Sequence, residues 1–436
     1  MIAHYFALAL RNLSKSPMMS AALLVALALG VGASMTMLTV VRVMSWDPLP
    51  GRSAQLYHPF IDPLPLTAKP REGSDPRISL TWVDAKALLD GGPADGQVAL
   101  ASGRVLLPAQ SPGDDLSYVE GQFATSRVFD LFGIQLLQGS GWTDADDADH
   151  ANVIVLSASL ARRLASQAPL VGQQITLSGH GFRIVGIAAD WLPAPRFHTD
   201  MQRDVFAGKD DFFIPLETAI ALGLEVRNAI FSWGDVANSS NLQGPSATWL
   251  QFWVKLGSDR KRDEYSQFLQ NYAQGQADSG RFQRPQMPAI LPLRAYLQAR
   301  HIVPAEVKLQ LSLALAFLFV CVVNICALLY ARLSRRNHEI AIRRALGARR
   351  VDIVLQLVIE ALLIGALGGG FAVLVAESGL WFLRTQPDGY AALAVMDWSM
   401  VLVTLVMACV CSFIAAGLPA LRAASTRIVM QMKAAQ

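Results

Sequence analysis

The stretch Arg335-Arg336-Asn337-His338-Glu339-Ile340-Ala341-Ile342-Arg343-Arg344-Ala345-Leu346-Gly347-Ala348-Arg349-Arg350 lies between two long apolar segments. It holds six arginines in 16 residues, while the segments on either side are almost free of charge. This alternation is typical of a short basic loop between two membrane spans, not of a globular core.

The same stretch has a helical pattern. Glu339 and Arg343 stand four residues apart, in the order that stabilises a helix. Ile342 and Leu346 line a different face, and Gly347 is a typical helix stop. Attraction to anionic lipid would explain the charge of the loop but not this pattern. We therefore predict a short amphipathic helix that fits a groove on another protein.

The composition indicates an integral membrane protein with a soluble part. Of 436 residues, 53% are hydrophobic and 16% charged, whereas about a quarter of the residues in soluble domains are charged. Four stretches exceed the roughly 20 apolar residues that cross a bilayer. The first is also longer than the apolar run of about 7–15 residues in a signal peptide, so we expect it to remain as a span. The four stretches are Pro17–Val41, Leu309–Ala331, Ile353–Leu383 and Trp398–Leu421.

Lysine and arginine are unevenly distributed between the connecting segments. Residues 332–353 carry a net charge of +5, and the residues after the fourth span carry +3. Residues 47–304 carry a net charge of −5. Because short basic loops stay in the cytoplasm, we expect both termini and the arginine-rich loop there and the large domain outside.

The large external domain is expected to mix helices and strands, with strands at Val153–Ser157, Gln174–Ser178 and Phe182–Ala188. Proline-rich stretches near residues 193–195 and 285–292 suggest boundaries within this domain and hence an inserted subdomain. The expected segments are an amphipathic N-terminal helix at 1–17, a first span at 18–45, an extracytoplasmic domain at 46–305 with the inserted subdomain at about 216–284, a second span at 306–331, a cytoplasmic coupling loop at 332–352, a third span at 353–383, a short periplasmic loop at 384–397, a fourth span at 398–421 and a cytoplasmic tail at 422–436.

Small residues recur at four-residue spacing in two spans. Such stripes let helix backbones approach closely in lipid. Packing within one chain and a subunit interface are both compatible with this pattern. The residues are Ala22, Ala26, Gly30 and Ser34 in the first span and Ala361, Gly365 and Gly369 in the third.

Glu360 is predicted to lie roughly 10 Å into the third span, at 1.5 Å per residue. An ionisable group at that depth is costly and is a functional candidate. It could brace a neighbouring helix through a hydrogen bond or form part of a polar path. We favour the brace, with Asn324 of the second span as partner, because the sequence offers no second buried charge nearby.

The chain has no catalytic signature. Phosphate-loop, nucleophile-elbow and zinc-protease motifs are all missing from the sequence. The four cysteines lie within predicted spans and show no metal-binding spacing. We expect a non-catalytic membrane subunit with no metal and no cofactor of its own.

Residues 339–348, followed by Asp352 and Ile353, resemble the signature of FtsX/MacB-type ABC transporter permeases, which is close to E-I-G-I-R-R-A-L-G-A. Ala341 replaces the usual glycine. Val119–Phe123 and Ile184–Ile187 are similar to the MacB-type periplasmic core. The resemblance implies that the ATPase-coupling residues are Glu339, Ile340, Ile342, Arg343, Arg344, Ala345, Leu346 and Gly347.

The resemblance implies a four-helix transmembrane permease with a large mixed α+β extracytoplasmic domain, a MacB-type periplasmic core, inserted between the first two helices. A separate ATPase dimer would bind ATP and magnesium and drive motion of the external domain, which is called mechanotransmission. Residues 426–430 depart from the family's ending, which bears on how the tail contacts the ATPase.

The expected task is efflux of an antibiotic, peptide or similar compound from the periplasm of a bacterial cell, by a multi-pass protein of the inner membrane. The expected partners are a second permease copy, a periplasmic adaptor, an outer-membrane channel and the lipid bilayer, but no nucleic acid. Two alternatives stay open: a lipoprotein-releasing permease and an FtsX-like regulator of a cell-wall hydrolase that does not transport.

Overall fold

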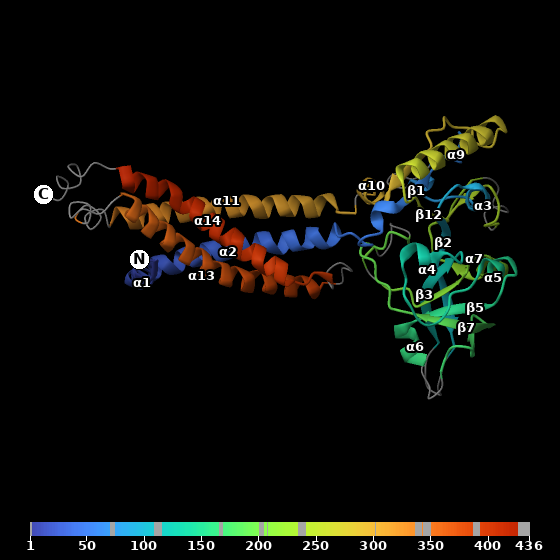
Figure 1. Ribbon diagram of the computed structural model, residues 1–436, viewed down its shortest axis with the longest axis horizontal. Helices are drawn as coiled ribbons and strands as arrows, with labels where there is room; N and C mark the ends of the chain where they lie inside the picture. Colours follow the sequence, from blue (N-terminus) through green and yellow to red (C-terminus); the bar gives the residue numbers. More distant parts are fainter. Residues whose placement is uncertain are drawn as a thin grey trace. The chain divides into compact units, whose positions relative to one another are not determined.

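The computed structural model divides the chain into two compact units, residues 1–45 with 303–436, and residues 46–302 (Figure 1). The residues that the structure describes are 2–69, 75–108, 116–164, 169–199, 205–206, 208–233, 241–300, 302–335, 342, 350–386 and 393–425.

The first unit is a helical bundle, which we call the membrane unit. Four of its helices are long and apolar enough to cross a membrane, as the sequence predicts. Pro17 opens the first of them, where its missing N–H costs nothing. The helices are α1 (Ile2–Lys15), α2 (Pro17–Met44), α11 (Ala305–Ser334), α13 (Arg350–Arg384) and α14 (Trp398–Ser425).

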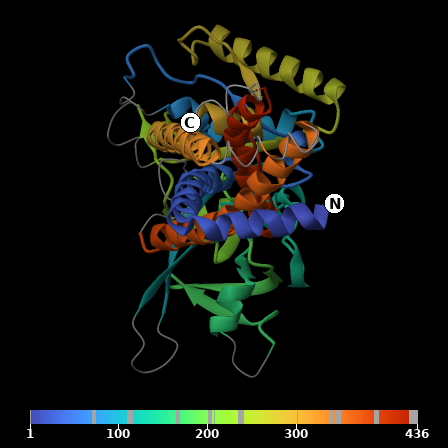
Figure 2. The same ribbon diagram turned by 90° about the vertical axis from the view of Figure 1, so that its left-hand side faces the viewer.

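Helix α2 packs against both α11 and α13, and α14 packs against α13 and α11. The end-on view shows α1 running across the bundle, crosswise to α2 (Figure 2). Small residues permit the close approaches, because a Cβ added to Gly32 would lie 2.7 Å from the Val375 Cβ of α13. The bundle is therefore held by van der Waals packing of the kind that joins helices in lipid.

The second unit, which we call the soluble unit, is built on an 11-stranded mixed sheet. The strand order is β13-β1-β12-β2-β3-β8-β5-β7-β4, with β6 on β7 and β9 on β2. The strands are β1 (Leu56–Phe60), β2 (Gly96–Leu107), β3 (Ser117–Ala124), β4 (Leu136–Gly139), β5 (Val153–Ser157), β6 (Gln174–Leu177), β7 (His180–Ala188), β8 (Phe212–Pro215), β9 (Glu225–Val226), β12 (Gln251–Lys255) and β13 (Ala289–Pro292), with a separate pair β10 (Phe231–Ser232) and β11 (Ala247–Thr248).

Alternate residues of the central strands enter two different cores. In β5, Ile154 and Leu156 join one apolar cluster, while Val153 and Val155 join the other. Because side chains alternate between the two faces of a strand, the sheet is covered on both faces. This explains the uninterrupted apolar run that marks β5 in the sequence.

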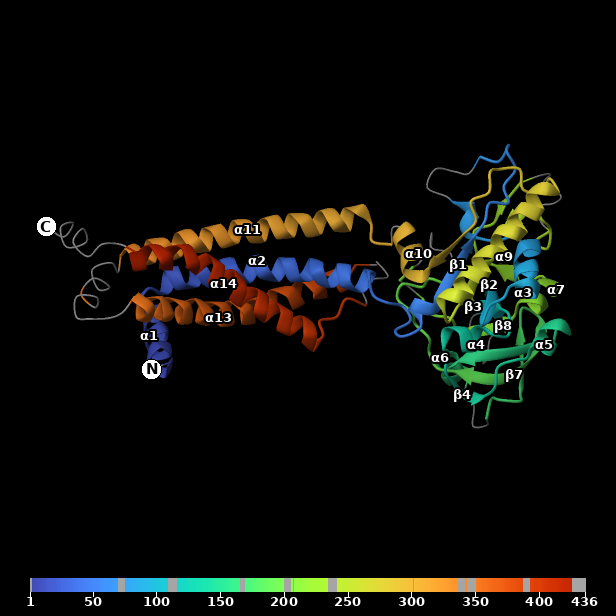
Figure 3. The same ribbon diagram turned by 45° about the horizontal axis from the view of Figure 1, so that its top comes forward.

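Short helices cover the two faces. Helices α3 (Trp82–Gly91) and α9 (Asp259–Asp278) lie together over one face (Figure 3), and the Tyr272 hydroxyl donates to Asp84 Oδ1 at 2.6 Å. The remaining helices are α6 (Ala158–Leu164) and α7 (Leu216–Ala221), packed on the same core, α4 (Val128–Phe132) and α10 (Leu293–Ala299) on the opposite core, and the exposed α5 (Asp144–Ala148).

The predicted strands at 153–157, 174–178 and 182–188 are confirmed within one or two residues. The hairpin between β6 and β7 turns on Ser178 and Gly179, both with positive φ, of 49° and 83°. Two positive φ angles in a two-residue loop are the mark of the type I′ turn, which suits the twist of paired strands.

The prediction of a subdomain inserted at about 216–284 differs from the structure. Strand β12, from the middle of that range, lies between β1 and β2 and pairs with both. The proline-rich stretch that suggested a boundary runs directly into β13, whose last residue is Pro292. Proline is tolerated there because β13 is the edge strand of the sheet.

His58 is an enclosed titratable group in the soluble unit. Its side chain is fully buried, stacked on Tyr296 at a centroid distance of 4.7 Å and edge-on to Trp253 at 5.2 Å. Burial, with a smaller contribution from the positive charge of Arg300, lowers the pKa of His58 to about 3. The folded soluble unit therefore contains this histidine in its neutral form.

We predict that the soluble unit loses stability on acidification through His58. The folded pKa is below the unfolded value, so the stability is complete above pH 6.5 and is lost as pH falls from 6.5 toward 3. At 1.36 kcal/mol per pH unit, the loss between pH 6.5 and pH 5 is about 2 kcal/mol. Urea unfolding of the detergent-solubilised chain at the two pH values measures it.

In His58→Phe the difference in unfolding free energy between the two pH values should shrink by that amount. His180→Phe, on the half-buried β7 hairpin, is the matched control and should keep the wild-type pH dependence. An unchanged pH dependence in His58→Phe would contradict the role of this residue.

We also predict opposite outcomes for two glycines of α13. A Cβ at Gly365 would lie 2.7 Å from the Cys409 Cα of α14, whereas a Cβ at Gly370 meets nothing within 4 Å. Gly365→Ala should therefore lower the thermal unfolding temperature in detergent by forcing α13 and α14 apart. Gly370→Ala should leave it unchanged or raise it, because alanine favours the helix by about 1 kcal/mol. Equal effects of the two substitutions would show that backbone contact does not hold α13 to α14.

Candidate functional site

The predicted coupling site lies between α11 and α13. Helix α11 ends at Ser334, and α13 begins at Arg350. Of the predicted coupling residues, the structure describes Ile342, which is helical and about half exposed. The others, Glu339, Ile340, Arg343, Arg344, Ala345, Leu346 and Gly347, lie outside the described residues.

Glu360 is buried on α13, with an exposed fraction of 4%. The predicted partner, Asn324, is exposed on α11. Instead Glu360 Oε1 lies 3.3 Å from Arg332 Nη1, and Arg332 is itself only 6% exposed. The expectation that no second buried charge lies nearby is therefore wrong.

Sequence reasoning missed Arg332 because it counted this residue with the arginines of the loop. The available signal was its place two residues before the end of α11, on the apolar side of the loop. A long guanidinium side chain reaches between helices where the short amide of asparagine does not. Removal of either partner from a buried ion pair typically costs about 3–5 kcal/mol, because the other charge is left unpaired.

The four small residues of α2 differ in whether they are buried against a neighbouring helix. Gly30 lies against Cys321 of α11, where a Cβ would come within 2.9 Å. The Ser34 hydroxyl donates to Gly30 O and also lies 3.0 Å from Ala314 O of α11. Gly30 and Ser34 thus pack within the chain, while Ala26 is half-buried and Ala22 is exposed.

The small residues of α13 face α14. Ala361 is 2% exposed. Gly365 and Gly369 lie against Cys409 and Ala408 respectively. This stripe is used for packing within the chain.

The opposite end of the bundle is held by exposed polar pairs. Arg42 of α2 donates to the Ser399 hydroxyl of α14 at 2.9 Å, and Arg384 pairs with Glu377 on α13. Trp381 and Trp398 are exposed at this end, with exposed fractions of 64% and 89%. Exposed tryptophans flanking apolar helices are typical of the boundary between lipid and water.

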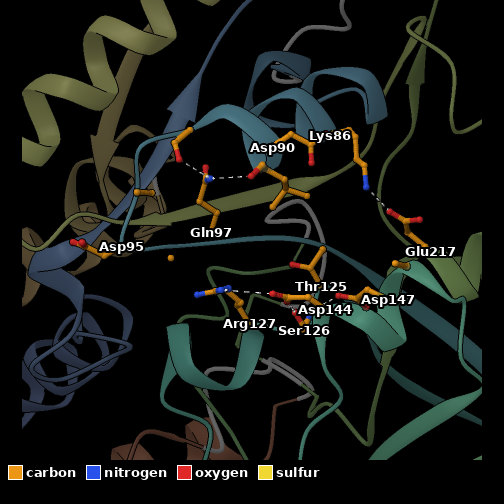
Figure 4. Close-up of a pocket in the computed structure, with 15 residues that line it drawn as sticks. Lys86, Asp90, Asp95, Gln97, Thr125, Ser126, Arg127, Asp144, Asp147 and Glu217 are labelled. Carbon is orange, nitrogen blue, oxygen red and sulfur yellow. Dashed lines mark hydrogen bonds and ion pairs between the residues drawn. The ribbon is translucent and has the colours of Figure 1, made fainter.

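The soluble unit contains a polar cleft of about 430 Å³ beside α3 (Figure 4). Lys86 of α3 and Glu217 of α7 meet across it at 2.9 Å. On its floor Arg127 lies 3.6 Å from Asp144. Because much of its charge is neutralised by these internal pairs, its geometry assigns the cleft no particular ligand.

The acidic run 144–149 borders this cleft, and its first five residues form the short helix α5. Thr143 and Asp146 make a capping box at its start. Asp147 accepts hydrogen bonds from the Ser126 amide at 2.7 Å and from Trp142 Nε1 at 2.8 Å. Burial raises the pKa of Asp147 to about 6 despite these donors.

A buried charged cluster lies elsewhere in the soluble unit. Asp210 accepts from Arg196 Nη2 at 2.6 Å and from Gln122 Nε2 at 2.7 Å, and it lies 2.8 Å from His198 Nε2. Burial alone would raise the pKa of Asp210, but Arg196 and His198 outweigh it and hold the pKa at about 2. His198 is fully buried and Asp210 is 1% exposed, so the cluster stabilises the chain between β7 and β8 and is closed to a substrate.

Two family models match consecutive parts of the chain. A model described as MacB-like periplasmic core domain matches residues 20–272. A model described as FtsX-like permease C-terminal matches residues 311–428.

Curated relatives share the same name. The macrolide export ATP-binding/permease protein MacB of Aggregatibacter actinomycetemcomitans is 23% identical over 257 residues, which cover 57% of this chain and 34% of the relative. The protein of that name from Sodalis glossinidius is 41% identical over 66 residues, 15% of this chain and 10% of the relative. The chain thus matches about a third or less of the length of these relatives.

Solved structures are also similar. The periplasmic region of MacB from Actinobacillus actinomycetemcomitans has 15% identity and a TM-score of 0.37, over 58% of this chain and 96% of that one. The extracellular domain of the noncanonic ABC-type transporter YknZ from Gram-positive bacteria has 14% identity and a TM-score of 0.34, over 54% and 99%.

The first family model alone covers more than half of the chain, and the second covers α11, α13 and α14. The protein therefore belongs to the family of FtsX-like ABC transporter permeases that carry a MacB-like periplasmic core domain.

Proposed function

We propose that this chain is the permease subunit of an ABC transporter of the MacB type, powered by an ATPase dimer in a separate chain. The observation that carries the proposal is the match of the FtsX-like model to residues 311–428, which enclose the arginine-rich loop between two spans. ATP and magnesium would be bound by the ATPase, and this chain would supply no catalytic group.

In this proposal, closure of the ATPase dimer on ATP pushes the helix around Glu339–Leu346. The push tilts α11 and α13, and α2 carries the motion toward the soluble unit, which follows it in the chain. The close contacts of α2 with α13, such as Gly32 against Val375, favour joint movement of these helices. The mechanism needs no passage of substrate between the spans.

The proposed orientation places both termini and the arginine-rich loop in the cytoplasm of a bacterial cell and the soluble unit in the periplasm. It is supported by the net charge of +5 on residues 332–353.

The proposed task is efflux of an antibiotic, peptide or similar compound, with a second permease copy, a periplasmic adaptor and an outer-membrane channel. The name macrolide export permease of the curated relatives supports an export task.

We predict that Glu339→Lys uncouples the ATPase. Reversal of this charge places a lysine beside the loop arginines, so the loop should lose its fit to the ATPase while the spans fold normally. ATP turnover of the reconstituted complex, and the amount of ATPase that co-purifies, should both fall. Glu306→Lys, an exposed charge reversal at the other end of α11, is the matched control. Wild-type turnover in Glu339→Lys would count against docking through this loop.

We predict that a pull-down of this chain from its native membrane, followed by mass spectrometry, captures an ABC ATPase and a periplasmic adaptor. An ATPase found with a lipoprotein carrier or with a cell-wall hydrolase would replace efflux with lipoprotein release or with hydrolase regulation. Capture without any ATPase would overturn the proposed function.

A further inference from the structure

Arg332 and Glu360 join the two helices that flank the arginine-rich loop. Helix α11 ends two residues after Arg332, at Ser334, and α13 begins at Arg350. A force applied to the loop therefore enters the membrane unit through these two helices.

The two flanking helices make most of their contacts with other helices. Both pack against α2 and against α14. Within the parts of α11 and α13 that the structure describes, few residue pairs of these two helices come close to each other. Figures 1 and 3 show α2 running between them. Packing thus connects α11 and α13 to each other mainly through α2 and α14.

The ion pair is a direct link between them. Arg332 Nη1 and Glu360 Oε1 are 3.3 Å apart, and the two residues are 6% and 4% exposed. Separation of the helices at this level would break an ion pair inside the bundle, which is unfavourable. The pair therefore fixes the spacing of the helices more firmly than an apolar contact would.

A displacement of α13 at Glu360 is passed to α14 and α2 by residues that lie within about two helical turns of Glu360. Gly365 lies against the backbone of α14, where a Cβ would be 2.7 Å from Cys409 Cα. Gly368 lies against Leu27 of α2, where a Cβ would be 2.5 Å from Leu27 Cδ2. Because the helices are in close contact at these glycines, a movement of α13 at Glu360 also moves α2 and α14.

We propose that the Arg332–Glu360 pair is a positioning device that holds α11 and α13 at fixed spacing, so that a push on the loop moves both helices as one body. This inference rests on the proposed function for the source of the push. The fixed spacing itself is a property of the chain alone, and it can be tested without the ATPase.

The test measures the distance between α11 and α13 by double electron–electron resonance in lipid nanodiscs. Spin labels are attached to Ala327→Cys and Leu362→Cys, which are exposed positions near the pair, after the four native cysteines are replaced by alanine. Glu360→Gln removes the charge with little change of shape. Glu377→Gln, the same substitution at an exposed ion pair of the same helix, is the matched control.

For the chain alone, we expect one narrow distance distribution in the wild type and in Glu377→Gln, and a broadened one in Glu360→Gln. The double variant Arg332→Glu/Glu360→Arg, which keeps both charges, should restore the narrow distance distribution. A wild-type distribution in Glu360→Gln would overturn the proposal. The proposal would also be overturned if Glu360→Gln fails to fold while the double variant folds and shows a broad distribution of distances between the labels.

With the ATPase and ATP present, the wild-type peak should shift as a whole. In Glu360→Gln, ATP turnover should continue while the joint shift is lost, an outcome that a role in stability alone does not produce. If the ATPase fails to bind the wild type, the proposed function fails, and the distributions of the chain alone still decide the role of the pair.

Discussion

The membrane unit depends on one constraint: in hydrocarbon, a charge or a polar backbone group must find its partner within the protein. Helices satisfy the backbone, and small residues let them approach so closely that side-chain hydroxyls reach neighbouring carbonyls, as Ser34 does with Ala314 O. The same constraint explains the position of Arg332 and Glu360. Two ionisable residues within the bundle are tolerated because they face each other.

In the soluble unit the governing constraint is the two-sided burial of the sheet. A strand buried on both faces cannot show the alternation of apolar and polar residues that reveals a half-exposed strand. Val153–Ser157 is all buried, and its sequence is apolar almost throughout. Charged residues that enter such a core must be neutralised there, as Asp210 is by Arg196, and His198 adds a hydrogen bond to it.

Much of this architecture could be predicted from the sequence because its signals are local. Span length, charge distribution and strand pattern each depend on neighbouring residues, and the predicted spans and the strands at 153–157 and 182–188 appear in the structure. The position of Arg332 marks it as a candidate, but its pairing with Glu360 does not follow from the sequence, because pairing between helices depends on their rotation about their axes. The prediction of an inserted subdomain was wrong for a related reason. The pairing of β12 with β1 joins residues nearly 200 apart along the chain, such as Leu56 and Lys255, and its pairing with β2 joins residues more than 150 apart.

Strand β2 has a consequence for how this protein can be cut and recombined. Its first half, Gly96–Leu100, pairs with β12, and its second half, Leu100–Leu107, pairs with β3. One strand thus links the two parts of the sheet, and the part with β1, β12 and β13 is built from residues on both sides of the segment that forms the other part. A chimera that exchanges residues 216–284 with those of a relative would replace β12, which lies inside the sheet. The replaced strand would then have to pair with the original β1 and β2 on its two sides. The junctions that respect the hydrogen bonding of the sheet lie at residues 45 and 303, so the soluble unit is exchangeable between relatives as a whole and not in halves.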